Sequence, residues 1–228
     1  MYEKVSWDEF KRRFRWKQGE HVTATAPTGS GKTTLFSELM PYRGYNIMFG
    51  TKKKDKTYTR ILAQGFKRVQ SIDEIKPWDK NVLLWPSHSS DIADTKATQR
   101  FEFRRAMNMV MNQGSWTLWA DEAKYMAEML SLSKELTFMM EQLRSINATI
   151  ICGAQRPAWL PRSVLSNSTH VFLWKATDME DAKRLADIGG IDKKAVLEEM
   201  KTLGKYEFLY IRTRGTDANI VRSQVERS

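Results

Sequence analysis

Short apolar segments alternate along the chain with longer amphipathic ones, and glycine, proline and polar residues separate them. The short segments are typical of buried strands, which we expect at residues 21–26, 45–50, 67–70, 81–86, 116–123, 147–155 and 170–176. The amphipathic segments predict helices at residues 2–17, 32–40, 57–66, 94–113, 134–145 and 178–190. Two further strands, at residues 206–213 and 218–225, are expected to form a terminal β-hairpin.

Strands that alternate with helices indicate an α/β fold, with a mostly parallel sheet that helices cover on both faces. Ligands bind such a sheet at the carboxyl ends of its strands. The chain has 228 residues, 41% of them hydrophobic, which is enough to form the core of one domain.

The composition excludes several classes of protein. The single cysteine, Cys152, excludes an internal disulfide and a cysteine-rich metal site, and the three histidines lack a zinc-binding spacing. No apolar run reaches about 18 residues, so we expect no membrane span. The N-terminus is too charged for a signal peptide. We therefore expect a cytoplasmic protein.

The formal net charge of +10 favours a polyanionic partner, most commonly nucleic acid. A solvated basic surface without such a partner is the alternative.

The segment TATAPTGSGKTT, residues 23–34, places two glycines and a lysine directly after the first predicted strand. It matches the phosphate-loop pattern G-x-x-x-x-G-K-[ST], except that Ala26 replaces the first glycine. Backbone N–H groups and a helix N-terminus bind phosphates in such a loop. The predicted contacts are Thr28, Gly29, Ser30, Gly31, Lys32, Thr33 and Thr34. Lys32 would reach the β- and γ-phosphates, and the Thr33 hydroxyl would bind magnesium. A flexible Gly/Ser loop does not explain the lysine and threonine at this spacing.

The apolar segment WTLWADE, residues 116–122, ends in two carboxylates. Asp121, at the strand end, is expected to hold magnesium through water, and Glu122 to orient and deprotonate the attacking water. An acidic pair at a helix N-terminus is the alternative. Combined with the phosphate loop, the pair predicts a nucleotide site that uses ATP and Mg²⁺. A water-activating carboxylate here favours ATP hydrolysis over phosphoryl transfer to a small molecule.

A third motif, IICGAQRP at residues 150–157, resembles the signature of the FtsK–HerA superfamily of DNA-translocating ATPases. The resemblance covers residues 20–215 and implies a RecA/ASCE-type P-loop ATPase core, in which Gln155 senses the γ-phosphate or the attacking water. Residues 1–19 would then be an N-terminal helical extension and residues 216–228 a C-terminal strand and tail. The family's Asp-x-Lys motif is only partly kept, as Gly50-Thr51-Lys52.

The compact chain resembles the small viral genome-packaging ATPases of this superfamily more than the large cell-division translocases. These motors form rings in which an arginine of one subunit completes the site of its neighbour. The resemblance favours Arg144 for this role, with Arg156 and Arg162 as further candidates. The alternatives are a helix C-terminal cap for Arg144 and a local ion pair with an acidic residue for Arg156.

A ring motor holds DNA phosphates through basic side chains. The candidates are TKKKDK at residues 51–56, RFEFRR at residues 100–105, Lys124 and Lys134. Each is also typical of an ordinary solvated surface, and the spacing of Phe101 and Phe103 favours burial in the core over base stacking.

The sequence thus predicts an ATP-driven double-stranded DNA translocase that works as a homo-oligomeric ring. If the protein is viral, the resemblance implies packaging in the host cytoplasm, at a capsid portal or vertex. The alternatives are a RecA- or DnaB-like recombination or helicase ATPase, and an assembly or secretion factor that ATP switches.

Overall fold

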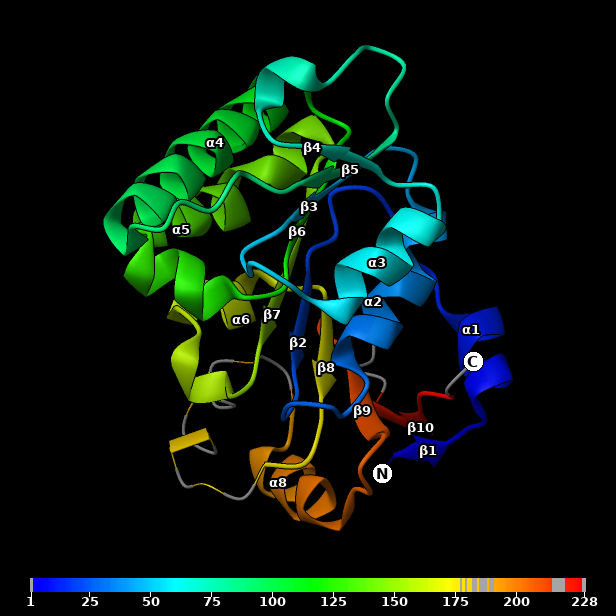
Figure 1. Ribbon diagram of the computed structural model, residues 1–228. Helices are drawn as coiled ribbons and strands as arrows, with labels where there is room; N and C mark the ends of the chain where they lie inside the picture. Colours follow the sequence, from blue (N-terminus) through cyan, green and yellow to red (C-terminus); the bar gives the residue numbers. More distant parts are fainter. Residues whose placement is uncertain are drawn as a thin grey trace.

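The computed structural model describes residues 2–176, 178, 180–181, 184, 188, 191–214 and 220–226. These residues form one ten-stranded sheet (Figure 1). Its strands are β1 (Glu3–Lys4), β2 (Val22–Thr25), β3 (Asn46–Phe49), β4 (Lys67–Val69), β5 (Asn81–Leu84), β6 (Thr117–Ala120), β7 (Thr149–Ala154), β8 (His170–Leu173), β9 (Glu207–Arg212) and β10 (Ile220–Gln224). The strand order is β1-β10-β9-β8-β2-β7-β6-β3-β5-β4.

The seven strands from β8 to β4 in this order are parallel, and β9 pairs antiparallel with both β8 and β10. The α/β fold with a mostly parallel sheet and the terminal β9–β10 hairpin are therefore confirmed. Parallel neighbours place their carboxyl ends at one edge, and β2 lies near the middle of the sheet, between β8 and β7. The phosphate-loop segment that follows β2 consequently begins at the centre of this edge.

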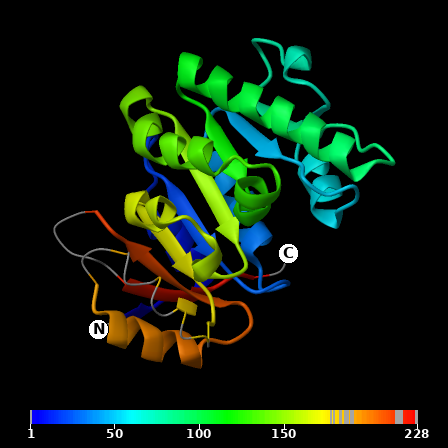
Figure 2. The same ribbon diagram turned by 90° about the vertical axis from the view of Figure 1, so that its left-hand side faces the viewer.

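Helices cover both faces of the sheet (Figure 1). They are α1 (Trp7–Arg13), α2 (Lys32–Leu39), α3 (Lys56–Ala63), α4 (Ile92–Gln113), α5 (Ser133–Gln142), α6 (Arg162–Asn167) and α8 (Lys193–Thr202). Short turns of helix occur at η1 (Met40–Tyr42), η2 (Ile72–Glu74), η3 (Tyr125–Met129), η4 (Leu143–Ile146) and η5 (Pro157–Trp159); η3 is a π-helix. In Figure 2, α4 and α5 cover one part of the sheet, and α8 lies below the C-terminal strands.

The buried side chains form two clusters, one on each face of the sheet. One cluster contains buried residues of α4, α5, α6 and α8. The other contains the aromatic side chains of α1 together with buried residues of α2 and α3. Because both faces are covered, every residue of the central strands β2, β3 and β6 is buried, including the few polar ones. Among the described ranges, none of the helices combines the length and the apolar character that crossing a bilayer requires.

The N-terminal segment differs from the predicted helix at residues 2–17. Glu3 and Lys4 form strand β1, parallel to β10, and the helix begins only after Ser6, whose side chain caps it by accepting a hydrogen bond from the Glu9 N–H. The partner strand lies more than 200 residues away in the chain, so the local pattern does not reveal the pairing. The prediction also missed α6 and α8, and the helix predicted at residues 178–190 falls largely outside the described residues.

The prediction that Phe101 and Phe103 are both core residues is wrong for Phe101. Phe103 is fully buried and stacks on Phe49 at 4.6 Å between ring centroids, whereas Phe101 is 61% exposed. Residues two apart in an α-helix point about 200° apart around its axis. Only one of the two can therefore face the sheet.

Candidate functional site

The phosphate-loop segment connects β2 to α2 in a conformation that depends on its glycines. Gly29 and Gly31 have φ angles of 76° and 97°, in the left-handed region that favours glycine. Ala26 is fully buried, its backbone φ is not positive, and its N–H donates to the Ala154 carbonyl at 3.0 Å. The replacement of the first motif glycine by alanine therefore introduces no backbone strain.

The acidic pair follows β6, at the same edge of the sheet as this loop. The Lys32 ammonium forms an ion pair with the Asp121 carboxylate and donates to the Asp121 carbonyl at 3.1 Å. The Thr33 hydroxyl donates to Asp121 Oδ2 at 3.1 Å. Lys32 and Thr33 thus meet Asp121, which lies nearly 90 positions further along the chain. The side chains of Lys32 and Asp121 are both mostly buried.

The oxygens of Thr33 and Asp121 suit magnesium, which prefers hard oxygen ligands and usually keeps water and substrate phosphates as its other ligands. The described part of the chain contains no group of three or more His, Cys, Asp and Glu side chains placed to hold a metal.

Gly153 on β7 is a site residue that the sequence prediction missed. A Cβ atom at this position would lie 2.6 Å from both the carbonyl oxygen and Oδ1 of Asp121. β7 lies between β2 and β6, so the absence of a side chain lets Asp121 approach the phosphate loop. The signal in the sequence is a glycine inside a strand that is rich in β-branched residues.

Glu122, the predicted base, forms an ion pair with Lys52 at 2.7 Å. Lys52 also pairs with Asp55 at 3.1 Å. Burial lowers the pKa of Lys52, but the hydrogen bonds and negative charges of Glu122 and Asp55 outweigh this effect and raise its pKa above the usual range. The lysine is therefore charged at neutral pH. The sequence prediction placed Lys52 in a basic DNA-binding segment and in the partly kept Asp-x-Lys motif, and it did not anticipate this contact.

Gln155 follows β7 and is exposed at the edge of a hollow of about 320 Å³. Glu122, Tyr125, Met129 and Trp159 also line this hollow. Gln155 and the predicted base therefore border the same space.

The three candidate arginines lie in different surroundings. Arg144 is exposed in η4, before β7, whereas the predicted nucleotide site lies beyond the other end of that strand. A six-residue strand spans about 20 Å, so Arg144 cannot reach the site of its own subunit. Arg156 pairs with Asp178 at 2.5 Å and Asp181 at 3.1 Å, which is the local ion pair considered as its alternative. Arg162 begins α6.

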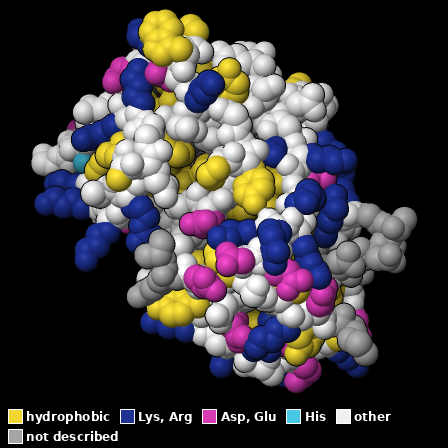
Figure 3. All heavy atoms as spheres, turned by 90° about the vertical axis from the view of Figure 1, so that its right-hand side faces the viewer, with side chains coloured by type: hydrophobic (Ala, Val, Ile, Leu, Met, Phe, Trp, Pro, Cys, Tyr) yellow, Lys and Arg dark blue, Asp and Glu magenta, His cyan; other side chains and the backbone are white. Residues whose placement is uncertain are grey.

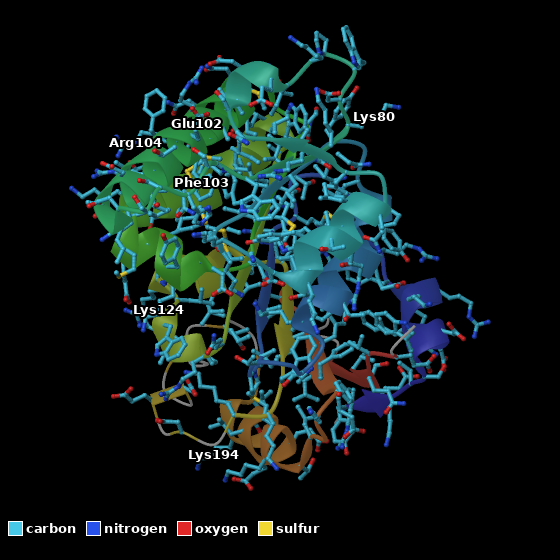
Figure 4. The ribbon with its side chains drawn as sticks, in the orientation of Figure 1. Lys80, Glu102, Phe103, Arg104, Lys124 and Lys194 are labelled. Carbon is cyan, nitrogen blue, oxygen red and sulfur yellow. The ribbon has the colours of Figure 1, made fainter. Side chains whose placement is uncertain are left out.

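Several basic side chains of the predicted DNA-binding segments already contact acidic or aromatic side chains of the protein. Arg104 pairs with Glu135 at 2.6 Å and Arg105 with Asp73 at 2.5 Å (Arg104 is labelled in Figure 4). The Lys124 ammonium lies 4.0 Å from the centre of the Trp159 ring. In Figure 3, Lys and Arg side chains spread over much of the face on the right of Figure 1, and Asp and Glu lie among them, mostly in its lower half.

No protein-family model matches the chain, and no curated protein matches it significantly. Solved structures do match. The DNA-packaging ATPase B204 from Sulfolobus turreted icosahedral virus is similar with a TM-score of 0.65 and 15% identity, over 93% of this chain and 100% of that one. VirB4 of Thermoanaerobacter pseudethanolicus is similar with a TM-score of 0.66 and 11% identity, over 91% of this chain and 89% of that one.

The pCW3 conjugation coupling protein TcpA is similar with a TM-score of 0.53 and 13% identity, and the match covers 89% of this chain and 59% of TcpA. The chain therefore shares its fold with these three proteins, one of which is a DNA-packaging ATPase.

Proposed function

We propose that the protein is a Mg²⁺-dependent ATP hydrolase. The observation that carries the proposal is the meeting of Lys32, Thr33 and Asp121 at the carboxyl edge of the sheet, with Glu122 as the next residue. The Lys32 ammonium is held by Asp121, a position from which it can transfer to a phosphate. Backbone N–H groups of residues 28–33 and the N-terminus of α2 would hold the phosphate chain.

Each remaining residue has a distinct chemical task in this proposal. Thr33 and Asp121 hold the magnesium ion, which neutralises charge on the phosphates when it is bound. Glu122 takes a proton from the attacking water, and Gln155, which borders the same hollow, orients that water. Residues 20–215 form the ATPase core.

We further propose that the hydrolase drives double-stranded DNA through a homo-oligomeric ring, as a viral genome-packaging motor. The net charge of +10 suits a phosphate backbone as partner, and a DNA-packaging ATPase is among the structural neighbours. The exposed position of Arg144, at the far end of β7 from its own site, suits a residue that completes the site of a neighbouring subunit.

Glu122→Gln tests the hydrolase. It removes the proton acceptor but keeps the size of the side chain, so turnover should fall about 100- to 10,000-fold while ATP still binds. Glu141→Gln, at an exposed position on α5, is the matched control and should hydrolyse ATP at the wild-type rate. Unchanged hydrolysis in Glu122→Gln would reject Glu122 as the base.

A comparison of duplex and single-stranded DNA tests the motor. We expect duplex DNA to stimulate hydrolysis more strongly, and the stimulation to fall steeply as salt rises, because phosphate contacts release counterions. Stronger stimulation by single strands would favour the helicase or recombinase alternative.

A further inference from the structure

A second hollow, of about 210 Å³, lies between α1 and the strands β1, β9 and β10, which Figure 1 shows at its lower right. Phe10, Phe14, Tyr210 and Arg212 are among the residues that line it. Arg212 pairs with His170 at the amino end of β8, whereas the phosphate loop follows the carboxyl end of the neighbouring strand β2. The hollow is therefore separate from the proposed nucleotide site.

The guanidinium of Arg212 has hydrogen-bonding capacity that the protein leaves unused. Within the described ranges, its Nε atom is buried and has no acceptor. Its contact with Glu20 Oε1 is 3.6 Å long, too long for a hydrogen bond. The other oxygen of Glu20 instead accepts from the Lys17 N–H at 2.8 Å and lies 3.0 Å from the His170 ring nitrogen. Since a buried donor without an acceptor destabilises a fold, this arginine suits an acceptor that a ligand brings.

The charges around the hollow favour a single carboxylate over a polyanion. Arg13, the other arginine that lines it, is already paired with Glu3 and Glu9, each at 2.7 Å. These acids and Glu20 repel a chain of phosphates, so a nucleic acid backbone does not suit this surface. A guanidinium binds one carboxylate through parallel hydrogen bonds. The aromatic residues beside Arg212 favour an apolar group attached to that carboxylate.

The hollow adjoins a free edge of the sheet. In the described part of the chain, β1 is the last strand on this side and pairs only with β10, so its outer backbone groups are available to a further strand. Glu3 and Val5 line the hollow, so a peptide that pairs with this edge can place its last side chain inside. The volume is below the roughly 300–1,000 Å³ of small-molecule pockets. Both features favour the end of a polypeptide over a free small molecule.

We propose that this hollow binds the C-terminal residue of a partner polypeptide that ends in an apolar side chain. The side chain packs among Phe10, Phe14 and Tyr210, and the terminal carboxylate binds Arg212. Such a contact would attach the proposed motor to another protein while its nucleotide site stays free. The inference does not depend on ATP hydrolysis.

The test is an NMR titration with a short peptide that ends in phenylalanine, the same peptide with an amidated C-terminus, and phenylpropionate. The free peptide should bind, and Arg212→Gln should weaken its binding about 10- to 100-fold, because the charge-assisted hydrogen bonds are lost. Arg212→Lys keeps the charge without the planar fork and should give an intermediate affinity. Arg12, which is exposed on α1 and does not line the hollow, is the control, and Arg12→Gln should bind like the wild type.

A thermal melt establishes that each variant is folded. Val221→Phe fills the hollow without removing a charge and should also prevent binding. Three results would overturn the inference: equal binding of the free and amidated peptides, wild-type affinity in Arg212→Gln, or no binding of the free peptide at millimolar concentration. Equal affinities of phenylpropionate and the peptide would also overturn it and would assign the hollow to a free small acid.

Discussion

A methyl group added at Gly153 should disturb the proposed magnesium site directly. The new Cβ would lie 2.6 Å from two oxygens of Asp121, about 0.8 Å short of the 3.4 Å at which ordinary contact begins. One of these oxygens belongs to the backbone, and β7 is paired on both sides, so neither strand can yield freely. Overpacking of this kind costs about 1–3 kcal/mol in the free energy of unfolding.

The effect on catalysis should exceed the effect on stability. A displacement on the order of 1 Å at a reacting centre can cost about 100-fold in rate, and the shift would move Asp121 relative to Lys32 and Thr33. We expect Gly153→Ala to unfold at a lower urea concentration and to hydrolyse Mg·ATP on the order of 100 times more slowly. Gly44→Ala is the control, since a Cβ there meets nothing within 4 Å. Wild-type hydrolysis by Gly153→Ala would refute the close approach of β7 to Asp121.

Two further predictions concern stability and are measured by urea unfolding. Phe103→Ala should cost about 3–5 kcal/mol because the ring is fully buried, whereas Phe101→Ala should change the free energy of unfolding by about 0.5 kcal/mol or less; similar losses would contradict the assignment of the two faces. Burial lowers the pKa of His21 to about 4, so the unfolded chain, with a histidine pKa of about 6.5, takes up the proton first as the pH falls. The contribution of neutral His21 to the free energy of unfolding is fully present above about pH 6.5. It decreases as the pH falls toward 4, by up to about 3 kcal/mol. Equal urea midpoints at pH 7 and pH 5 would contradict this.

The pattern of the proposed nucleotide site can be recognised in the sequence because its chemistry is local. A phosphate loop needs glycines for its backbone conformation and a lysine and threonine at fixed positions. Residues 26–34 contain all of these within one short segment. The acidic pair after an apolar strand is equally local. Since parallel strands end at one edge, the strand pattern alone indicated that Lys32 and Asp121 would lie close together.

Other features depend on contacts between distant segments. The pairing of β1 with β10 joins segments near the two ends of the chain. β1 has only two residues, which is too short for a recognisable strand pattern in the sequence. The faces of Phe101 and Phe103 depend on how α4 rotates against the sheet, which the periodicity of a helix with apolar residues on several sides did not determine.

The sequence by itself determined the α/β class, the order of the central elements and the residues suited to bind a nucleotide, because backbone conformation and apolar periodicity act over a few residues. Only the tertiary structure decided which charges meet. Lys52 reaches Glu122, and Arg156 reaches Asp178 and Asp181. An ion pair depends on the distance between two side chains in space, and that distance is set by strand register and loop packing, which no local stretch of sequence contains.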